Sequence, residues 1–296
     1  MSTVLAVDVG GTKVAAGLVD RTGRLGAHTT RPTNGGGAVF DALADAIIEV
    51  TTDAEPVGVG IASAGPLDAV AGTVSPINIP TWQGFPLCDR VRELIGDRPV
   101  RLAGDGVCMA LGEHWAGAGA GSDAMLGMVV STGVGGGLVV DGRPLAGHSG
   151  NAGHVGHVIV EPGGAPCACG GHGCVESVAS GPNLVRWART RGWTGTDAGQ
   201  LADDARAGAA VPRAAFRRGG WAVGLAVVAA GAVCDIEVAV IGGGVGQVGD
   251  LLLDPVRETV AEYGRLSYLH TLRVVPATLG TAAGLYGAAA LAFDNP

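Results

Sequence analysis

The sequence has little charge and no concentration of positive charge. Only 16% of the 296 residues are charged, the formal net charge is −8, and Lys and Arg are scattered along the chain. Nucleic acids and anionic membrane surfaces attract concentrated positive charge, which neutralises their phosphates. The composition therefore argues against both as partners.

Long apolar segments are missing as well. The best candidate for a membrane span, residues 219–234, is rich in glycine and shorter than the about 20 residues that a transmembrane helix needs. No basic region precedes the apolar residues at 1–6, as a secretory signal would require. We therefore expect a soluble, untargeted protein of the cytoplasm. Its 47% apolar content predicts a large buried core.

The chain also lacks two common nucleotide-binding motifs, because neither the Walker A spacing nor the Rossmann Gly-x-Gly-x-x-Gly follows a strand convincingly. What is present is a repeated unit of strand, glycine turn and strand, found at 4–9, 10–13 and 14–19 and again at 125–131, 132–137 and 138–140. The repeat predicts two related α/β lobes that face each other across a cleft.

The predicted lobes are residues 1–118 together with a C-terminal helix at 281–296, and residues 119–280. The boundary falls in the glycine-rich run 117–122, which could equally be the loose end of a helix. Apolar patterns between the repeats predict helices at 38–50 and 87–95 and strands at 57–62 and 100–103.

The glycine turns have the composition of phosphate sites. Glycine lets backbone N–H groups approach an anion, while Thr and Lys add a hydroxyl donor and a positive charge. A single glycine turn commonly serves a hairpin alone, but two such turns followed by a third glycine run at 242–244 favour an ATP cleft. The predicted contacts are the phosphates with Gly10, Gly11, Thr12, Lys13, Thr132 and Gly133, the adenosine with Gly243 and Gly244, and a water-mediated Mg2+ with Asp8.

Half of the six cysteines fall within eight residues, at Cys167, Cys169 and Cys174, and His157 lies ten residues upstream. Three thiolates and an imidazole form a tetrahedral set for a closed structural Zn2+. The alternative is a pair of loop disulfides, although the Cys-x-Cys spacing is awkward for bridging.

Four motifs together resemble the ROK sugar kinases, the bacterial family of repressors, open reading frames and kinases. They are Asp-Val-Gly-Gly-Thr-Lys at 8–13, Ser-Thr-Gly-Val-Gly-Gly-Gly at 131–137, Gly-His-Val-Gly-His at 153–157, and the cysteine signature at 167–176. The resemblance implies an actin-like or hexokinase-like two-lobe ATPase fold, use of ATP and Mg2+, and transfer of the γ-phosphoryl to the 6-hydroxyl of a hexose. It also implies a homodimer.

The same resemblance assigns roles to individual residues. Asp105 would be the catalytic base, although an Asp at the start of a helix is more often a cap when seen in isolation. His157 would serve both the zinc and the sugar, so that the metal orients a substrate contact. The sugar contacts implied by the family are Gly65, Asn78, His157 and Glu176.

Two positions depart from the family pattern. His154 stands where glucokinase-like members have a Glu that grips the anomeric and C2 end of the sugar, and Gly104 replaces an Asn before the catalytic Asp. An imidazole can donate to or accept from an acetamido group without adding negative charge, and the motif looks like that of the bacterial N-acetylmannosamine kinases of sialic acid catabolism. The alternative is a glucose site in which His154 simply replaces the Glu.

Two non-catalytic alternatives belong to the same family. A sugar-responsive repressor would need a helix-turn-helix domain, and only Met1, Ser2 and Thr3 precede the first predicted strand. An inactive sugar-sensing protein is the other alternative, and the retained Asp8, Thr12, Thr132 and Asp105 argue against it.

Overall fold

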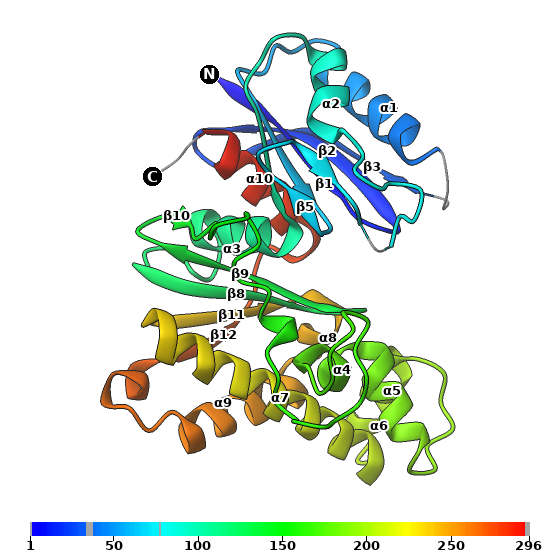
Figure 1. Cartoon of the computed structure of the whole chain (residues 1–296), viewed down its shortest axis with the longest axis vertical. Coiled ribbons are helices and arrows are strands. Elements are labelled where there is room, and N and C mark those ends of the chain that lie inside the picture. Colours follow the sequence, from blue (N-terminus) through cyan, green and yellow to red (C-terminus); the bar gives the residue numbers. More distant parts are fainter. Residues whose placement is uncertain (1, 34–37, 77, 294–296) are drawn as a thin grey trace. The chain divides into compact units, whose positions relative to one another are not determined.

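The computed structural model describes residues 2–33, 38–76 and 78–293 (Figure 1). The chain forms two compact units, Met1–Gly121 with Gly137–Gly153 and Thr281–Pro296, and Ser122–Gly136 with His154–Gly280. These units are close to the lobes expected from the sequence, except that residues 137–153 join the first unit. The division into functional lobes stays a prediction.

The first unit contains a five-stranded sheet in the order β3-β2-β1-β4-β7. Strand β1 pairs antiparallel with β2 and parallel with β4, and β4 pairs parallel with β7. Successive side chains of β1 point to opposite faces of the sheet, so that Leu5 and Val7 belong to one hydrophobic core and Val4 and Ala6 to another. The strands are β1 (Thr3–Val9), β2 (Lys13–Asp20), β3 (Leu25–Pro32), β4 (Val59–Ser63) and β7 (Val100–Gly104).

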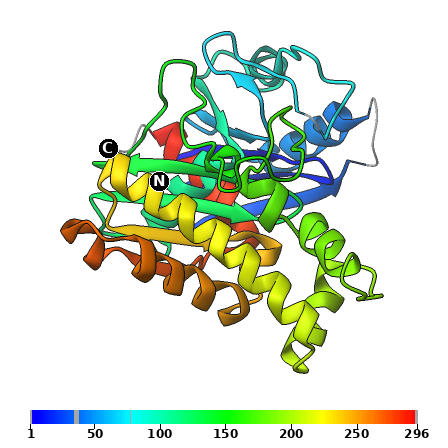
Figure 2. The ribbon, with the colours of Figure 1, turned by 60° about the horizontal axis from the view of Figure 1, so that its bottom comes forward.

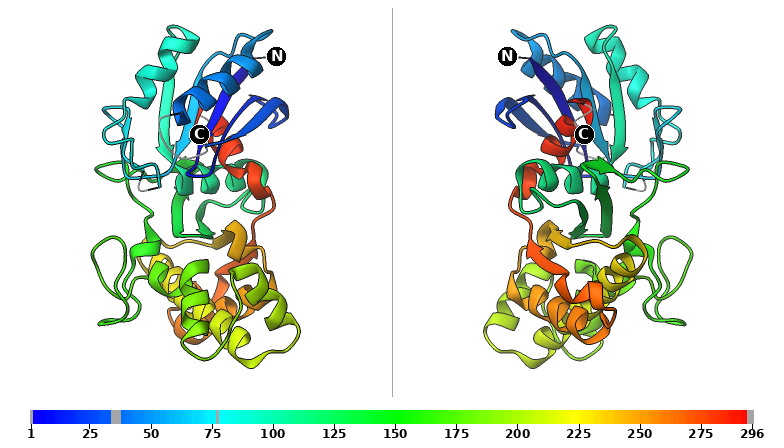
Figure 3. Two further views of the ribbon diagram at one scale, coloured as in Figure 1. Left: turned by 90° about the vertical axis from the view of Figure 1, so that its right-hand side faces the viewer. Right: turned by 90° about the vertical axis from the view of Figure 1, so that its left-hand side faces the viewer.

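Helices cover both faces of this sheet. Helices α1 and α2 lie on the face of the first core and α10 on the other face (Figure 3). Position 60 in β4 is occupied by glycine, and α10 packs so close to it that a Cβ there would overlap the Ala288 carbonyl. The remaining elements of this unit are α1 (Val39–Thr51), the hairpin β5 (Leu67–Asp68) and β6 (Thr73–Val74), α2 (Leu87–Ile95), α3 (Asp105–Ala116), β10 (Arg143–Pro144) and α10 (Ala283–Phe293).

The second sheet has the order β10-β9-β8-β11-β12, with β11 parallel to both β8 and β12. Its strands are β8 (Ala124–Val130), β9 (Val134–Val140), β11 (Val238–Gly242) and β12 (Arg273–Pro276). The returning strand was expected from residue 138, but β9 begins at Val134. The turn is shorter than expected because the Ser131 N–H donates to the Gly133 carbonyl at 2.8 Å, which frees the later glycines to join the sheet.

The helices of the second unit follow the strand β9 in sequence. The longest, α7, packs side by side with α9 (Figure 2). Among the described residues, no helix is long and apolar enough to cross a membrane. The bounds are η1 (Val155–His157), α4 (Val175–Ala179), α5 (Gly181–Arg189), α6 (Ala198–Arg206), α7 (Ala210–Cys234), α8 (Gly243–Gly246), α9 (Asp250–Tyr263), η2 (Ser267–Thr271) and, leading into α10, η3 (Gly280–Ala282).

Candidate active site

The first glycine turn joins β1 to β2. It is closed by the Gly10 N–H, which donates to the Lys13 carbonyl at 3.0 Å. Thr12 and Lys13 are exposed, and Lys13 is the only lysine in the sequence. The side chain of Asn78 lies over the turn, because a Cβ on Gly11 would come within 2.7 Å of the Asn78 Cβ. The fold thus brings a predicted sugar contact against a predicted phosphate turn.

Asp8 is the penultimate residue of strand β1, just before this turn. Burial is the largest cause that raises the pKa of Asp8 from 3.8 to about 6. The negative charge of Asp105 contributes to this rise, and the positive charge of Lys13 opposes it. A Cβ on Gly284, at the start of α10, would overlap the Asp8 carboxylate. This carboxylate is therefore held in a tight space next to a second carboxylate.

Asp105 is the first residue of α3 and directly follows β7. Its side chain is exposed, and its Oδ1 accepts from the Gly106 N–H at 2.7 Å. The N-cap position of α3 is Gly104, and the Asp105 carboxylate binds a backbone N–H of the first helical turn, so the roles of helix cap and catalytic base both stay open. The strand end and the helix start together hold the carboxylate at the surface. Gly65 likewise lies just past the end of a strand, two residues after β4.

The second glycine turn follows β8. The Gly181 N–H donates to the Ser131 carbonyl at 2.8 Å, which ties the turn to the start of α5. The Val134 N–H donates to Glu176 Oε2 at 2.9 Å, which ties the same turn to α4. Thr132 and Gly133 therefore lie between two helices that the sequence pattern did not connect with them.

A cavity of about 590 Å³ opens beside this turn, entirely within the second unit. Gly243 has a positive φ of 85°, and a Cβ there would meet the Val130 backbone, so only glycine fits. Gly244, which the sequence predicts to contact adenosine, lines the cavity. Most of the other lining residues could not be predicted from the sequence, because they come from α5, α6 and the segment between these helices. The cavity is lined by Ser131, Thr132, Gly181, Pro182, Val185, Arg189, Thr196, Asp197, Ala198, Gly199, Gly244 and Val245.

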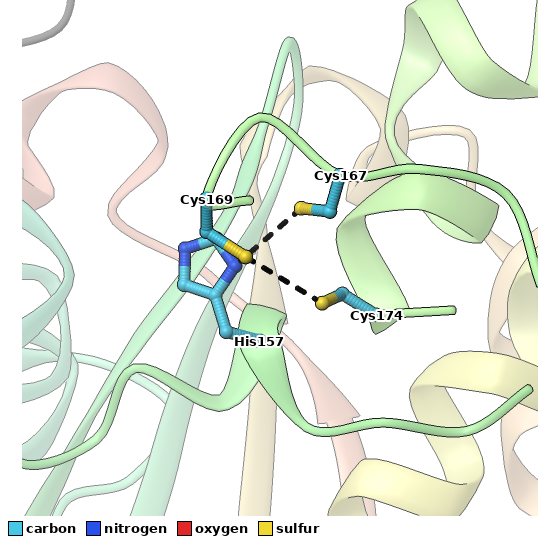
Figure 4. Close-up of side chains that lie close together, drawn as sticks. All are labelled: His157, Cys167, Cys169 and Cys174. Carbon is cyan, nitrogen blue, oxygen red and sulfur yellow. Dashed lines mark hydrogen bonds between the residues drawn. The ribbon is translucent and has the colours of Figure 1, made fainter. Parts of the chain in front are cut away.

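The four predicted metal ligands converge in one cluster. His157 ends η1, and the cysteines come from the following loop (Figure 4). The ligand atoms of His157, Cys167, Cys169 and Cys174 all lie within 4.8 Å of one another. The Cys169 and Cys174 sulfurs are 3.8 Å apart, and the Cys167 sulfur is 3.7 Å from His157 Nδ1.

These distances fit a tetrahedral zinc. With Zn–S and Zn–N bonds of about 2.3 and 2.1 Å, neighbouring ligand atoms are about 3.6–3.8 Å apart. All six cysteines are free, and a sulfur separation of 3.8 Å is far longer than a disulfide bond of about 2.05 Å. Burial raises the pKa of Cys174 to about 12, and a bound metal would instead hold this sulfur as a thiolate. The donor set therefore fits zinc and not a disulfide pair.

His154 directly precedes η1, and its carbonyl accepts from the His157 N–H at 3.0 Å. The two imidazoles stack with their centroids 6.3 Å apart and an angle of 20° between the rings. His154 is exposed and His157 is half-buried. The position at which the chain departs from the family pattern thus lies next to a predicted metal and sugar ligand.

The predicted site residues fall into both units. The first unit holds Asp8, Gly10, Gly11, Thr12, Lys13, Gly65, Asn78 and Asp105, and the second holds Thr132, Gly133, His154, His157, Cys167, Cys169, Cys174, Glu176, Gly243 and Gly244. Within each unit the fold gathers residues that are distant in sequence, such as Gly11 with Asn78 and Gly133 with Glu176.

Comparison with known proteins identifies the class. The sequence model of the ROK family matches residues 4–295, and this chain belongs to that family. It is 36% identical over 308 residues to a glucokinase of Thermotoga maritima, covering 97% of this chain and 96% of the relative. It is 35% identical over 295 residues to an N-acetylmannosamine kinase of Yersinia pseudotuberculosis, covering 98% of each.

A solved structure agrees with this assignment. A ROK family glucokinase from Streptomyces griseus in complex with glucose and AMPPNP matches with a TM-score of 0.85 and 32% identity, over 99% of this chain and 100% of that one. The actin-like or hexokinase-like fold of the ROK sugar kinases, expected from the sequence motifs, is thereby confirmed.

Proposed function

We propose that this ROK sugar kinase transfers the γ-phosphoryl group of ATP to the 6-hydroxyl of an N-acetylated hexosamine, with N-acetylmannosamine as the preferred substrate. The family membership and the glucokinase with bound glucose and AMPPNP support the sugar and nucleotide classes. The observation that carries the choice of sugar is His154, whose ring stacks on that of His157.

Asp105 is the proposed catalytic base. Its exposed carboxylate, at the start of α3, takes the proton of the sugar 6-hydroxyl while that oxygen attacks the γ-phosphorus and ADP leaves. Hydrogen bonding to the Gly106 N–H limits the rotation of the carboxylate. In this proposal Asp105 acts by position and by accepting one proton, and the remaining catalytic groups neutralise phosphate charge.

The phosphates are assigned to the two glycine turns. Exposed Thr12 and Lys13 supply a hydroxyl and a positive charge in one turn, with Gly10 and Gly11 leaving room for the anion. Thr132 and Gly133 belong to the other turn. Mg2+ bound with ATP would neutralise the phosphates, and ionised Asp8 would hold its water shell.

The adenosine is assigned to the cavity of about 590 Å³, whose size lies within the range of ligand pockets. Gly244 lines it on one side, directly after Gly243, the other residue assigned to adenosine, and the α5 and α6 segments line the other side. Thr132 belongs to the proposed phosphate turn and also lines this cavity. In this proposal the nucleotide therefore lies with its base in the cavity and its phosphates toward the turn.

The zinc has a structural role in this proposal. With four protein ligands, no open position remains for a substrate or a water, so Lewis-acid chemistry is not assigned to it. His157 presents Nδ1 to the cluster, which leaves Nε2 for a sugar hydroxyl. The loop also fixes Glu176, and Gly65, Asn78 and His154 complete the proposed sugar contacts. Assembly as a homodimer stays an expectation from the family resemblance.

The second candidate function is glucokinase. The Thermotoga maritima glucokinase is 36% identical and the Yersinia pseudotuberculosis N-acetylmannosamine kinase is 35% identical, and this difference does not separate the two substrates. A neutral imidazole at position 154 can bind the acetamido group in either hydrogen-bonding sense, whereas a carboxylate can only accept. This chemistry favours the N-acetylated sugar.

A coupled assay of ADP release tests the proposal, with ATP, Mg2+ and a panel of N-acetylmannosamine, N-acetylglucosamine, glucose and mannose. The expected result is the highest kcat/KM with N-acetylmannosamine, and a loss of at least about 100-fold in kcat for Asp105→Asn. His154→Glu should shift the preference toward glucose. If glucose is preferred by the wild type, the protein is a glucokinase, and if no sugar is phosphorylated, the kinase assignment is wrong.

A further inference from the structure

The carboxylate of Glu176 connects the second glycine turn to the cysteine cluster. Its Oε2 accepts from the Val134 N–H at 2.9 Å, while its Oε1 lies 3.9 Å from the Cys167 sulfur. Helix α4, which carries Glu176, begins directly after Cys174. One side chain therefore contacts both the proposed phosphate turn and the proposed zinc site.

The turn is shaped around this carboxylate. A Cβ on Gly133 would lie 2.7 Å from Glu176 Oε2, which is closer than real side chains approach. The φ of Gly133 lies outside the left-handed region, so a side chain there is opposed by space and not by backbone conformation, and the group that would have to shift is the Glu176 carboxylate. Gly135 in the same segment differs, because a Cβ there would meet nothing within 4 Å.

We propose that Glu176 is a positioning residue that couples the two substrates: nucleotide bound at the second glycine turn orders the Val134 N–H, and this N–H orients the carboxylate for the sugar. The inference rests on the proposed function, which makes the turn a phosphate site and Glu176 a sugar contact. A carboxylate can accept several hydrogen bonds, so it can bind the turn and a sugar hydroxyl together.

Coupling of this kind is reciprocal. If nucleotide pre-orders the carboxylate, it tightens sugar binding, and the sugar must tighten nucleotide binding by the same factor. Allosteric couplings usually change affinity by about 5- to 150-fold. We expect the hydrogen bond between the Val134 N–H and the half-buried carboxylate of Glu176 to have an orienting effect within this range. We expect a factor of about tenfold.

Calorimetric titration tests this coupling. N-acetylmannosamine and glucose are titrated into the protein with and without Mg2+ and AMPPNP, and the ratio of the two sugar Kd values is compared between variants. The wild type and Gly135→Ala should show a ratio of about ten. Gly133→Ala, whose added methyl displaces Glu176, should show a ratio near one and weaker sugar binding without nucleotide.

A second pair of variants keeps the test open if Gly133→Ala does not fold. Glu176→Gln retains an oxygen that accepts from the Val134 N–H and should keep most of the ratio, although sugar binds less tightly. Glu176→Ala should lose the ratio. Zinc content and melting temperature, measured alongside, show that each variant is folded and keeps its metal.

The outcomes separate this inference from the proposed function. A wild-type ratio near one, or equal ratios in Gly133→Ala and Gly135→Ala, overturns the coupling while sugar phosphorylation still supports the kinase assignment. A wild type that neither binds nor phosphorylates any sugar of the panel overturns the proposed function itself.

Discussion

Replacing Asp8 by Asn should make the protein more stable at neutral pH while removing its activity. Asp8 lies at the end of a buried strand with a second carboxylate, Asp105, close enough to raise its pKa. Asn has nearly the same shape but no charge. The substitution therefore removes an unfavourable buried charge with little change in packing.

The magnitude follows from the pKa of Asp8, which is raised from 3.8 to about 6 in the folded protein. Each pH unit of this difference corresponds to about 1.4 kcal/mol, which gives about 3 kcal/mol in total. Because the folded state binds the proton more tightly, the wild type is relatively most stable below pH 4. This stability is lost as the pH rises from about 4 to about 6. Above pH 6 ionised Asp8 lowers the stability of the folded state by the full amount of about 3 kcal/mol.

The assay is thermal unfolding of the wild type and Asp8→Asn between pH 4 and pH 8, without nucleotide or Mg2+. At pH 8 the variant should melt higher by roughly 5–10 °C, and the difference should shrink toward pH 4. Asp53→Asn, at an exposed position after α1, is the control and should show no such trend. ADP release by Asp8→Asn should fall sharply, because an amide holds the water shell of Mg2+ less well than a carboxylate.

Two results would refute the reasoning. If Asp8→Asn is destabilised at pH 8 and this destabilisation disappears toward pH 4, ionised Asp8 makes a favourable ionic contact, and burial is not the main influence on its pKa. If the variant keeps full activity with Mg2+, the assignment of Asp8 to the metal water shell is wrong.

Three other perturbations probe separate parts of the molecule. Removal of zinc by a chelator should weaken sugar binding by at least about tenfold and ATP binding less, since the cluster supports His157. Ala198→Trp should raise the KM for ATP by about tenfold with little change in sugar Kd, because Ala198 lines the cavity assigned to adenosine. Gly60→Ala should lower the free energy of unfolding by about 3 kcal/mol through overlap with α10, whereas Gly58→Ala, whose Cβ would be 3.5 Å from its nearest neighbour, should not.

Calorimetry with sugar and with AMPPNP checks the first, ADP-release kinetics together with calorimetry of the sugar check the second, and chemical denaturation checks the third. A folded, metal-free protein that keeps its sugar affinity contradicts the role given to the zinc. Ala207→Trp, at the exposed end of α6, is the control for Ala198→Trp, and equal KM values in the two variants would show that the cavity does not hold the nucleotide. Equal stability of Gly60→Ala and Gly58→Ala would contradict the close approach of α10.

The parts of the site that lie close together in the sequence could be predicted from it. Cys167, Cys169 and Cys174 belong to one short loop, so their spacing alone indicates a shared ion, and the structure brings their sulfurs to distances that suit zinc. The two glycine turns could likewise be recognised from the strands that flank them. In these cases the relevant contacts form within a few residues, where backbone geometry limits the possible arrangements.

Other features depended on the tertiary structure. The cavity joins the turn after β8 to α5, α6 and α8, and no spacing in the sequence connects these segments. The hydrogen bond from Val134 to Glu176 spans 42 residues. The sequence determined the ROK family, the predicted set of metal ligands and the two glycine turns to which phosphates are assigned, because each depends on local patterns. Folding decided which turn Glu176 contacts, how long β9 is and why Asp8 holds a proton up to about pH 6, because burial and long-range contacts arise only when distant segments pack together.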